Sequence, residues 1–163
     1  SIFFAVVYML DYHVLNSSPL QDEEYQLQVQ QAEVERAALI NSGAFLNEES
    51  VTLLTDPAAL DAGKQIFTTN CVACHAADGG GLVGPNLTDD YWIHGGGIKN
   101  IFKVIKYGVV AKGMISWQSQ LNPKQMQDVA SYVISLHGTS PANPKQQEGT
   151  IWKESDSTAV ASK

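Results

Sequence analysis

Apolar and polar positions along the chain predict helices rather than strands. Residues 97–107 carry four apolar side chains at the i, i+3, i+4, i+7 spacing of one helix face: Ile98, Ile101, Phe102 and Ile105. Asp56-Pro57 and Asn122-Pro123 each combine an N-cap acceptor with proline at the first helical position, so a helix is expected to begin at each. Alternating strand patterns are absent from the sequence, and the predicted fold class is all-α.

The chain opens with a short apolar segment, IFFAVVYML, at residues 2–10. A membrane-spanning helix needs roughly 20 apolar residues, so this run is too short to cross a bilayer alone. It also lacks the basic flank and the small-residue cleavage site of a signal peptide. We expect residues 1–18 to be the end of a transmembrane helix, with Tyr8, Tyr12 and His13 at the membrane boundary. A buried strand or a short core helix is the alternative.

Three further segments follow this apolar run. Residues 19–56 are expected to form an acidic connector, helical over 19–42 and a polar, turn-rich linker over 47–56. Because its apolar stripe is thin, the helix is either a solvated spacer or an element that docks on a partner. Residues 57–140 are expected to form one globular domain. The polar, proline-containing tail at 141–163 is predicted to be extended or disordered.

Charge is distributed unevenly along the 163 residues. The formal net charge is −7, and residues 22–56 alone hold eight acidic residues against one arginine. Residues 57–140 hold five aspartates against six lysines and are close to neutral. This balance argues against a nucleic-acid binder, whose affinity depends on basic residues that face phosphates. The two cysteines are too few for a disulfide scaffold.

Both cysteines belong to a CxxCH motif formed by Cys71, Cys74 and His75, which is typical of c-type haem attachment. Two thiols three positions apart at a helix end can bond to the two vinyl groups of one porphyrin, and the next imidazole can ligate the iron. A redox dithiol and half of a zinc site are the alternatives. The first lacks a βαβ setting, and the second lacks further ligands in CxxC or HxxxH spacing.

A haem iron with His75 on one side leaves a sixth position to be filled. Met114 is the predicted ligand, because it follows 39 residues later in a loop between two predicted helices. A thioether ligand raises the reduction potential, which suits an electron carrier. Filling a gap in the core is the alternative role for this methionine. His94 and His137 are the rival ligands.

Residues 57–140 resemble a class I cytochrome c domain. The resemblance rests on the CxxCH motif, a GPNL segment and a GMxxW segment. It implies a fold around one covalently bound haem c. It also implies that the Pro85 carbonyl bonds the second ring nitrogen of His75 and that Trp117 lies near the haem. Many members of the family place proline directly after the ligand methionine, where this chain has Ile115.

The same resemblance implies one helix-packing contact. In class I cytochromes a glycine and an aromatic residue of the first helix pack against an aromatic residue of the last helix. In this chain the matching residues are Gly63, Phe67 and Tyr132.

Three longer segments resemble the haem-bearing subunit III (the P subunit) of cbb3-type cytochrome c oxidases: GPNLTDDYWIHGG at 84–96, GMxxW at 113–117 and LHGTSPANPKQQEG at 136–149. This resemblance implies that Leu87, Tyr91 and Trp92 also contact the haem. The usual subunit carries two CxxCH motifs, whereas this chain has one.

The resemblance to subunit III implies a non-catalytic electron-transfer subunit. Its N-terminal helix would anchor it in the bacterial inner membrane, with the cytochrome domain on the periplasmic side. It would relay single electrons from a donor cytochrome c or a quinol-oxidising complex to the other oxidase subunits, where O2 is reduced. A membrane-anchored monohaem cytochrome of another oxidase or a dehydrogenase is the alternative in the same class. A haem gas sensor, a peroxidase or a CxxC metal-binding module is the alternative from other classes.

Four lysines support a further hypothesis. Lys99, Lys103 and Lys106 recur at i, i+4, i+7, opposite the apolar face of residues 97–107, and Lys112 follows them. A solvated helix face is the ordinary explanation. The alternative is a basic docking surface for an acidic redox partner, since complementary charge steers transient encounters.

Overall fold

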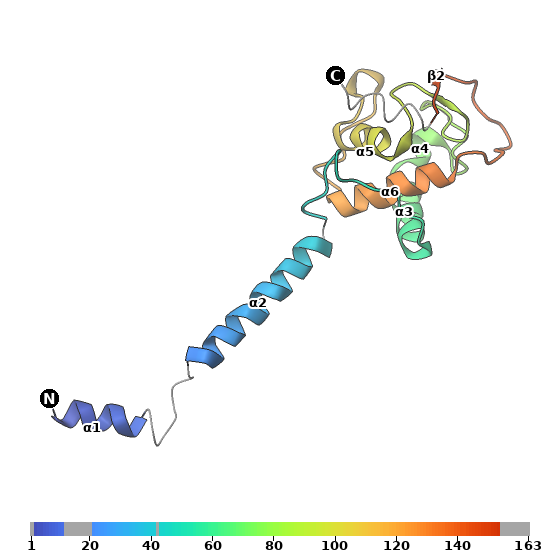
Figure 1. The fold of residues 1–163 in the computed structure, drawn as a ribbon. Helices are drawn as coiled ribbons and strands as arrows, with labels where there is room; N and C mark the ends of the chain where they lie inside the picture. Colours follow the sequence, from blue (N-terminus) through green and yellow to red (C-terminus); the bar gives the residue numbers. More distant parts are fainter. Residues whose placement is uncertain (1, 12–20, 42, 154–163) are drawn as a thin grey trace. The chain divides into compact units, whose positions relative to one another are not determined.

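The structure is a computed structural model that describes residues 2–11, 21–41 and 43–153. The chain divides into two compact units, Ser1–Asn41 and Ser42–Lys163, whose elements are drawn in Figure 1. Three predictions fall outside the described residues: the membrane-boundary positions of Tyr12 and His13, and the state of the tail over 154–163.

Two helices make up the described part of the first unit, α1 (Ile2–Leu10) and α2 (Gln21–Asn41). The helix predicted over 19–42 is therefore confirmed over 21–41. Side chains of α1 are exposed, including Phe3 and Phe4. None of the described helices is both long enough and apolar enough to cross a membrane, and α1 has nine residues.

The second unit contains the three predicted helices, α3 (Pro57–Asn70), α5 (Gly97–Tyr107) and α6 (Pro123–Ser135). The Asp56 side chain accepts a hydrogen bond from the Ala59 N–H, and Asn122 forms a reciprocal capping box with Gln125. Four short elements complete the described part of this unit: α4 (Val72–His75), the 3₁₀ turn η2 (Val110–Lys112), β1 (Tyr91–Trp92) and β2 (Thr150–Ile151). The two-residue strands are an exception to the all-α prediction.

Helices α3 and α6 cross at Gly63. A Cβ at this position would collide with the Asp128 carbonyl oxygen and lie 2.8 Å from the Tyr132 Cβ, so glycine permits the close approach. Four residues further along α3, the rings of Phe67 and Tyr132 pack with centroids 5.4 Å apart and an interplanar angle of 59°. The expected contacts of Gly63 and Phe67 with Tyr132 are confirmed.

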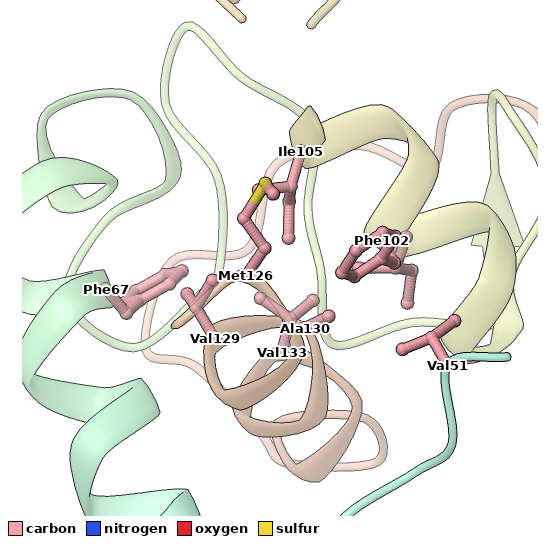
Figure 2. Packing of buried hydrophobic residues seen from close by; sticks show 9 residues of the cluster. Val51, Phe67, Phe102, Ile105, Met126, Val129, Ala130 and Val133 are labelled. Carbon is pink, nitrogen blue, oxygen red and sulfur yellow. The ribbon is translucent and has the colours of Figure 1, made fainter. Parts of the chain in front are cut away.

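The hydrophobic core lies between α3, α5 and α6 (Figure 2). Phe67 from α3 is 1% exposed, and Met126 from α6 points toward Ile105 of α5. The buried side chains of α5 are Ile101, Phe102 and Ile105, which confirms the apolar face predicted for this helix. Burial of each such side chain contributes roughly 1.5–3 kcal/mol, so this face holds α5 against α6.

The predicted linker before α3 is attached to the globular unit. Val51 is 2% exposed and belongs to the core (Figure 2). The Leu54 N–H donates to Ser131 Oγ over 3.1 Å, and Gln127 Nε2 donates to the Thr52 carbonyl oxygen over 2.8 Å. Val51 is the one buried residue of this short segment, and a single buried position gives no hydrophobic period, which is why the sequence indicated a linker here.

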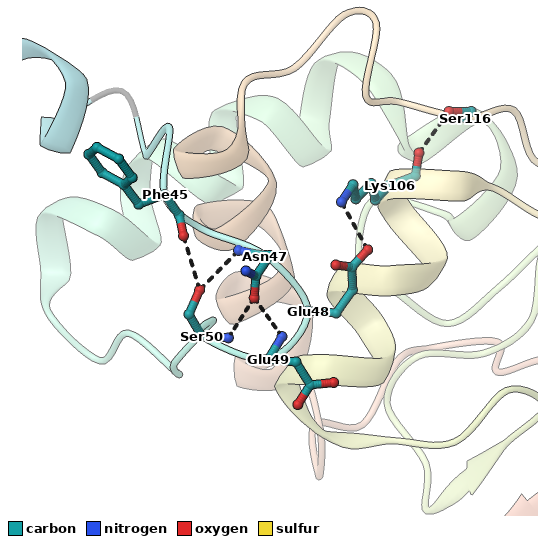
Figure 3. A network of polar contacts seen from close by, with 7 residues as sticks. All are labelled: Phe45, Asn47, Glu48, Glu49, Ser50, Lys106 and Ser116. Carbon is teal, nitrogen blue, oxygen red and sulfur yellow. Dashed lines mark hydrogen bonds and ion pairs between the residues drawn. The ribbon is translucent and has the colours of Figure 1, made fainter.

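A tight turn precedes Val51 and brings a carboxylate to α5 (Figure 3). Asn47 Oδ1 accepts hydrogen bonds from the N–H groups of Glu49 and Ser50, both over 2.9 Å. The turn places Glu48 Oε1 2.9 Å from Lys106 Nζ. This ion pair joins the segment before α3 to the last turn of α5.

The predicted lysine docking face is partly occupied by the chain's own acidic residues. Lys106 is paired with Glu48, and Lys99 Nζ lies 3.6 Å from Glu49 Oε2. Lys103 is exposed. Docking of an acidic redox partner on these lysines stays a hypothesis, and the two ion pairs reduce the positive charge that a partner would meet.

Glu48 provides a test of this attachment. Hydrogen bonds from Tyr107 and Lys106 lower the pKa of Glu48 from 4.5 to about 2. The lowered pKa stabilises the fold above pH 4.5, and this stability is lost as the pH falls toward 2. Glu48→Gln is expected to lower the free energy of unfolding at neutral pH by less than about 1 kcal/mol, because the pair is partly exposed.

Urea unfolding of the wild type and of Glu48→Gln, at neutral pH and at about pH 3, measures this difference. The two proteins are expected to differ at neutral pH and to differ less at about pH 3, where part of the contribution of Glu48 is lost. Glu49→Gln is the matched control, since its ion pair is longer and more exposed. A Glu48→Gln protein that loses as much stability in acid as the wild type would contradict the prediction.

The segment after α6 also contacts the globular unit. Its described part, residues 139–153, has no regular secondary structure apart from β2, which pairs antiparallel with β1. The Trp152 N–H donates to the Asp90 carbonyl oxygen over 2.9 Å. Its ring covers Gly96, where a Cβ would lie 2.5 Å from the indole. These contacts join residues far apart in the sequence, so no local pattern indicates them.

Candidate functional site

The CxxCH motif forms one helical turn at the end of α3. The Cys71 N–H donates to the Phe67 carbonyl oxygen over 2.8 Å, and the N–H groups of Cys74 and His75 donate to the Cys71 carbonyl oxygen over 3.1 and 2.9 Å. Both thiols are free; Cys71 is half-buried and Cys74 is exposed. The backbone therefore presents two thiols and an imidazole from a single turn.

The Cys71 thiol lies in an apolar environment. Burial raises its pKa to about 11, and the neighbouring Cys74 adds to the shift. A redox-active dithiol needs the opposite, a lowered pKa that supplies thiolate near neutral pH. The environment of Cys71 does not favour the dithiol alternative.

His75 is held by the backbone of the GPNL segment. Its Nδ1 lies 3.1 Å from the Pro85 carbonyl oxygen, which can only accept, so Nδ1 carries the proton and Nε2 keeps its lone pair. A Cβ at Gly84 would lie 2.7 Å from the ring. Burial lowers the pKa of His75, and the charge of Lys145 lowers it further, against the effect of the Pro85 bond. Burial thus favours the neutral imidazole, and the Pro85 bond leaves Nε2 available to a metal.

The loop between α4 and β1 folds back onto the CxxCH turn. The N–H groups of Leu82 and Gly84 both donate to the Cys74 carbonyl oxygen, over 3.0 and 2.9 Å. The Gly81 N–H donates to the His75 carbonyl oxygen over 3.0 Å. These bonds fix the distance between the imidazole and the segment that carries Pro85.

Met114 lies in a loop that pairs with Val109, two residues after α5, and with Ile105 of α5. The Val109 N–H donates to the Met114 carbonyl oxygen over 2.9 Å, and the Met114 N–H donates back over 3.2 Å. The Trp117 N–H donates to the Ile105 carbonyl oxygen over 3.1 Å. The hydrogen bonds hold the methionine in place relative to the core-facing helix.

Several predicted site residues meet at the core. The half-buried side chains packed against it include Cys71, Leu87, Trp92, Met114 and Trp117. The donors present fit haem c. They are two free thiols, an imidazole with Nε2 available and the thioether of Met114. Within the described residues no group of three or more His, Cys, Asp or Glu side chains is placed to hold a metal ion.

Comparison with known proteins assigns a family to this domain. The family described as "Cytochrome C oxidase, cbb3-type, subunit III" matches residues 58–133. These residues belong to the cbb3-type subunit III family. A cytochrome c domain implies haem c as the cofactor, and the mostly helical unit around α3, α5 and α6 agrees with this assignment.

Two relatives of the subunit III domain are cbb3-type cytochrome c oxidase subunits named CcoP. The protein from Rubrivivax gelatinosus is 33% identical over 144 residues, which cover 85% of this chain and 47% of the relative. The protein from Rhodobacter capsulatus is 41% identical over 95 residues, which cover 51% of this chain and 31% of the relative. The chain therefore spans less than half of the length of these relatives.

A solved structure, cytochrome CL from Methylophaga aminisulfidivorans MPT, is 29% identical to this chain. The match covers 51% of this chain and 56% of that chain, with a TM-score of 0.48.

The two histidines named as rival iron ligands have other surroundings. His137 Nε2 lies 2.7 Å from Asp90 Oδ1, so this nitrogen is paired with a carboxylate. His94 is exposed in the loop before α5. Tyr91 and Trp92 form β1, and their contact with haem stays a prediction.

The sequence-based site omitted Lys145, which lies in the segment 136–149 that resembles subunit III. Its Nζ donates to the carbonyl oxygens of Val83 and Gly84, over 3.1 and 3.4 Å. Lys145 belongs to an extended segment without periodicity. The resemblance of segment 136–149 to subunit III was therefore the one signal in the sequence that indicated Lys145.

Proposed function

We propose that this chain is an electron-transfer subunit of a cbb3-type cytochrome c oxidase that binds one haem c covalently. The observation that carries the proposal is the His75–Pro85 hydrogen bond next to two free thiols, within a domain of the subunit III family. Bound haem supplies reversible one-electron chemistry between ferric and ferrous iron. The chain's own residues attach the haem, ligate its iron and exclude other ligands.

Cys71 and Cys74 would attach the haem as thioethers. Each thiol adds across one vinyl group: sulfur bonds to one vinyl carbon and the thiol hydrogen passes to the other, so no electrons are exchanged. Because both thiols must be reduced for this addition, their free state is the competent one. The single turn that holds them gives the spacing that one porphyrin requires.

His75 Nε2 and the Met114 thioether would ligate the haem iron. The Pro85 carbonyl fixes the ring orientation and increases the electron donation of the imidazole. With both protein ligands on the iron, O2 would have no free site on this subunit. The reduction of O2 would then take place in other subunits, and this chain is not catalytic by itself.

The partners of the chain follow from the same assignment. The relatives are named as cbb3-type oxidase subunits, which supports the other oxidase subunits as partners. A donor cytochrome c or a quinol-oxidising complex would supply the electrons. The apolar run of α1 would be the end of a membrane anchor, with the cytochrome domain on the periplasmic side, where covalent haem attachment takes place.

The mass of the intact chain, isolated from a periplasm that attaches haem c, tests the central claim. We expect the mass of the polypeptide plus one haem, and a positive haem stain after denaturing electrophoresis. A polypeptide mass alone would overturn the proposal. Copurification of the tagged chain with haem-b-containing oxidase subunits tests the oxidase role, which its isolation alone would contradict.

Met114→Leu tests the axial ligand at nearly constant side-chain volume. The haem is expected to stay attached, because the thiols are unchanged, while the reduction potential falls and the ferrous form gains CO binding. Met126→Leu is the matched control, since Met126 is 2% exposed in the core and has no predicted ligand role. A ferrous Met114→Leu protein that binds no CO would assign the sixth position to another residue.

A further inference from the structure

Lys145 connects the segment after α6 to the loop that holds His75. Its backbone N–H donates to the Gly80 carbonyl oxygen over 2.8 Å. Its Nζ reaches the carbonyl oxygens of Val83 and Gly84, the two residues before Pro85. One residue therefore bonds both ends of a five-residue stretch that ends at Gly84.

These contacts act on the proximal ligand through two backbone groups. Gly84 lies directly against the His75 ring, since a Cβ there would be 2.7 Å from it. The next residue supplies the carbonyl that accepts the Nδ1 proton. An ammonium group on the Gly84 carbonyl oxygen therefore fixes the peptide that leads into the Pro85 hydrogen bond.

Lys145 also brings a positive charge to this site. Its side chain is 32% exposed, so solvent screens the charge only in part. This charge lies next to the carbonyl oxygens of Val83 and Gly84, and Lys145 Nζ is also 2.6 Å from Glu148 Oε1. A cation near the iron ligand disfavours the ferric state, which carries one more positive charge than the ferrous state.

We propose that Lys145 is a positioning residue of the haem site, which holds the Val83–Gly84 peptide against His75 and raises the reduction potential through its charge. The inference rests on the proposed haem binding. It gives the segment after α6 a role in setting the reduction potential of the haem. The negative charge of Glu148 would lower this potential, against the effect of Lys145.

Reduction potentials of the haem-loaded chain test the charge effect. Lys145→Gln is expected to shift the ferric–ferrous equilibrium toward ferric by a factor on the order of three to ten, where tenfold corresponds to about 59 mV for one electron. Glu148→Gln is expected to shift it in the opposite direction. Lys145→Arg keeps the charge and should stay near the wild type, as should the matched control Lys64→Gln on the exposed side of α3.

Exchange of the His75 Nδ1 proton, followed by NMR in the ferrous state, tests the positioning effect. The exchange rate of this proton is expected to rise in Lys145→Gln and to stay unchanged in Lys64→Gln. If the segment only anchored the fold, Lys145→Gln and Glu148→Gln would not shift the reduction potential in opposite directions.

Two outcomes would overturn the inference in different ways. Haem-loaded Lys145→Gln and Glu148→Gln proteins with the potential of Lys64→Gln would overturn it alone. A wild-type chain without covalent haem would overturn the proposed function together with it. If Lys145→Gln failed to fold, Glu148→Gln and Lys145→Arg would still decide the sign of the charge effect.

Discussion

Replacement of Cys71 and Cys74 together by serine is expected to abolish covalent haem attachment. A serine hydroxyl is a weak nucleophile that does not form the thioether, while its size and its fit to the helical turn are close to those of cysteine. The half-buried Cys71 and the exposed Cys74 tolerate this change without a collision. The intact mass should fall to that of the polypeptide, and the haem stain should be lost.

The single variants and a neighbouring control sharpen this test. Cys71→Ser and Cys74→Ser should each keep at most one thioether, at reduced yield. Ala73→Ser is the matched control, because Ala73 is exposed in the same turn and contributes no thiol. Covalent haem in the double variant, or its loss in Ala73→Ser, would contradict the assignment of the two thiols as anchors.

Gly63→Ala is expected to destabilise the globular unit strongly, against its local helix preference. Alanine favours a helix over glycine by roughly 1 kcal/mol, so an isolated helix would gain stability. In the folded chain the new Cβ would collide with the Asp128 carbonyl oxygen and lie 2.8 Å from Tyr132 Cβ. Backbone cannot yield as a flexible side chain does, and we expect a net loss of about 2–4 kcal/mol in the free energy of unfolding.

Urea unfolding of the Gly63→Ala protein measures this loss. Gln65→Ala on the exposed side of α3 is the matched control, and it should change stability by less than about 0.5 kcal/mol. A loss of the expected size would be a large part of the 5–15 kcal/mol typical of a small domain. A Gly63→Ala protein as stable as the wild type would show that α3 and α6 can separate without cost.

The helices of the globular unit were predictable because their signals are local. Asp56 and Asn122 cap α3 and α6 through bonds to residues three positions away. The apolar face of α5 repeats at helical spacing, and burial follows from that spacing. The CxxCH turn is local in the same sense, since both its thiols and its imidazole come from one turn.

The bonds that hold the site were less accessible to prediction. The His75–Pro85 hydrogen bond was expected from a family resemblance and is confirmed. The attachment of Val51 to the core and of Lys145 to the Gly84 carbonyl was not expected. Both residues belong to segments without periodicity, whose positions depend on distant partners.

By itself, the sequence determined three helices, the N-caps of two of them and a turn that carries two thiols and a histidine. These features depend on contacts within about one helical turn, which residue type and spacing encode directly. Only the tertiary structure decided how the segments on either side of the domain attach, through Val51 and Glu48 before α3 and through Lys145 after α6. Their free energy comes from partners tens of residues away, and a one-dimensional pattern contains no record of such partners.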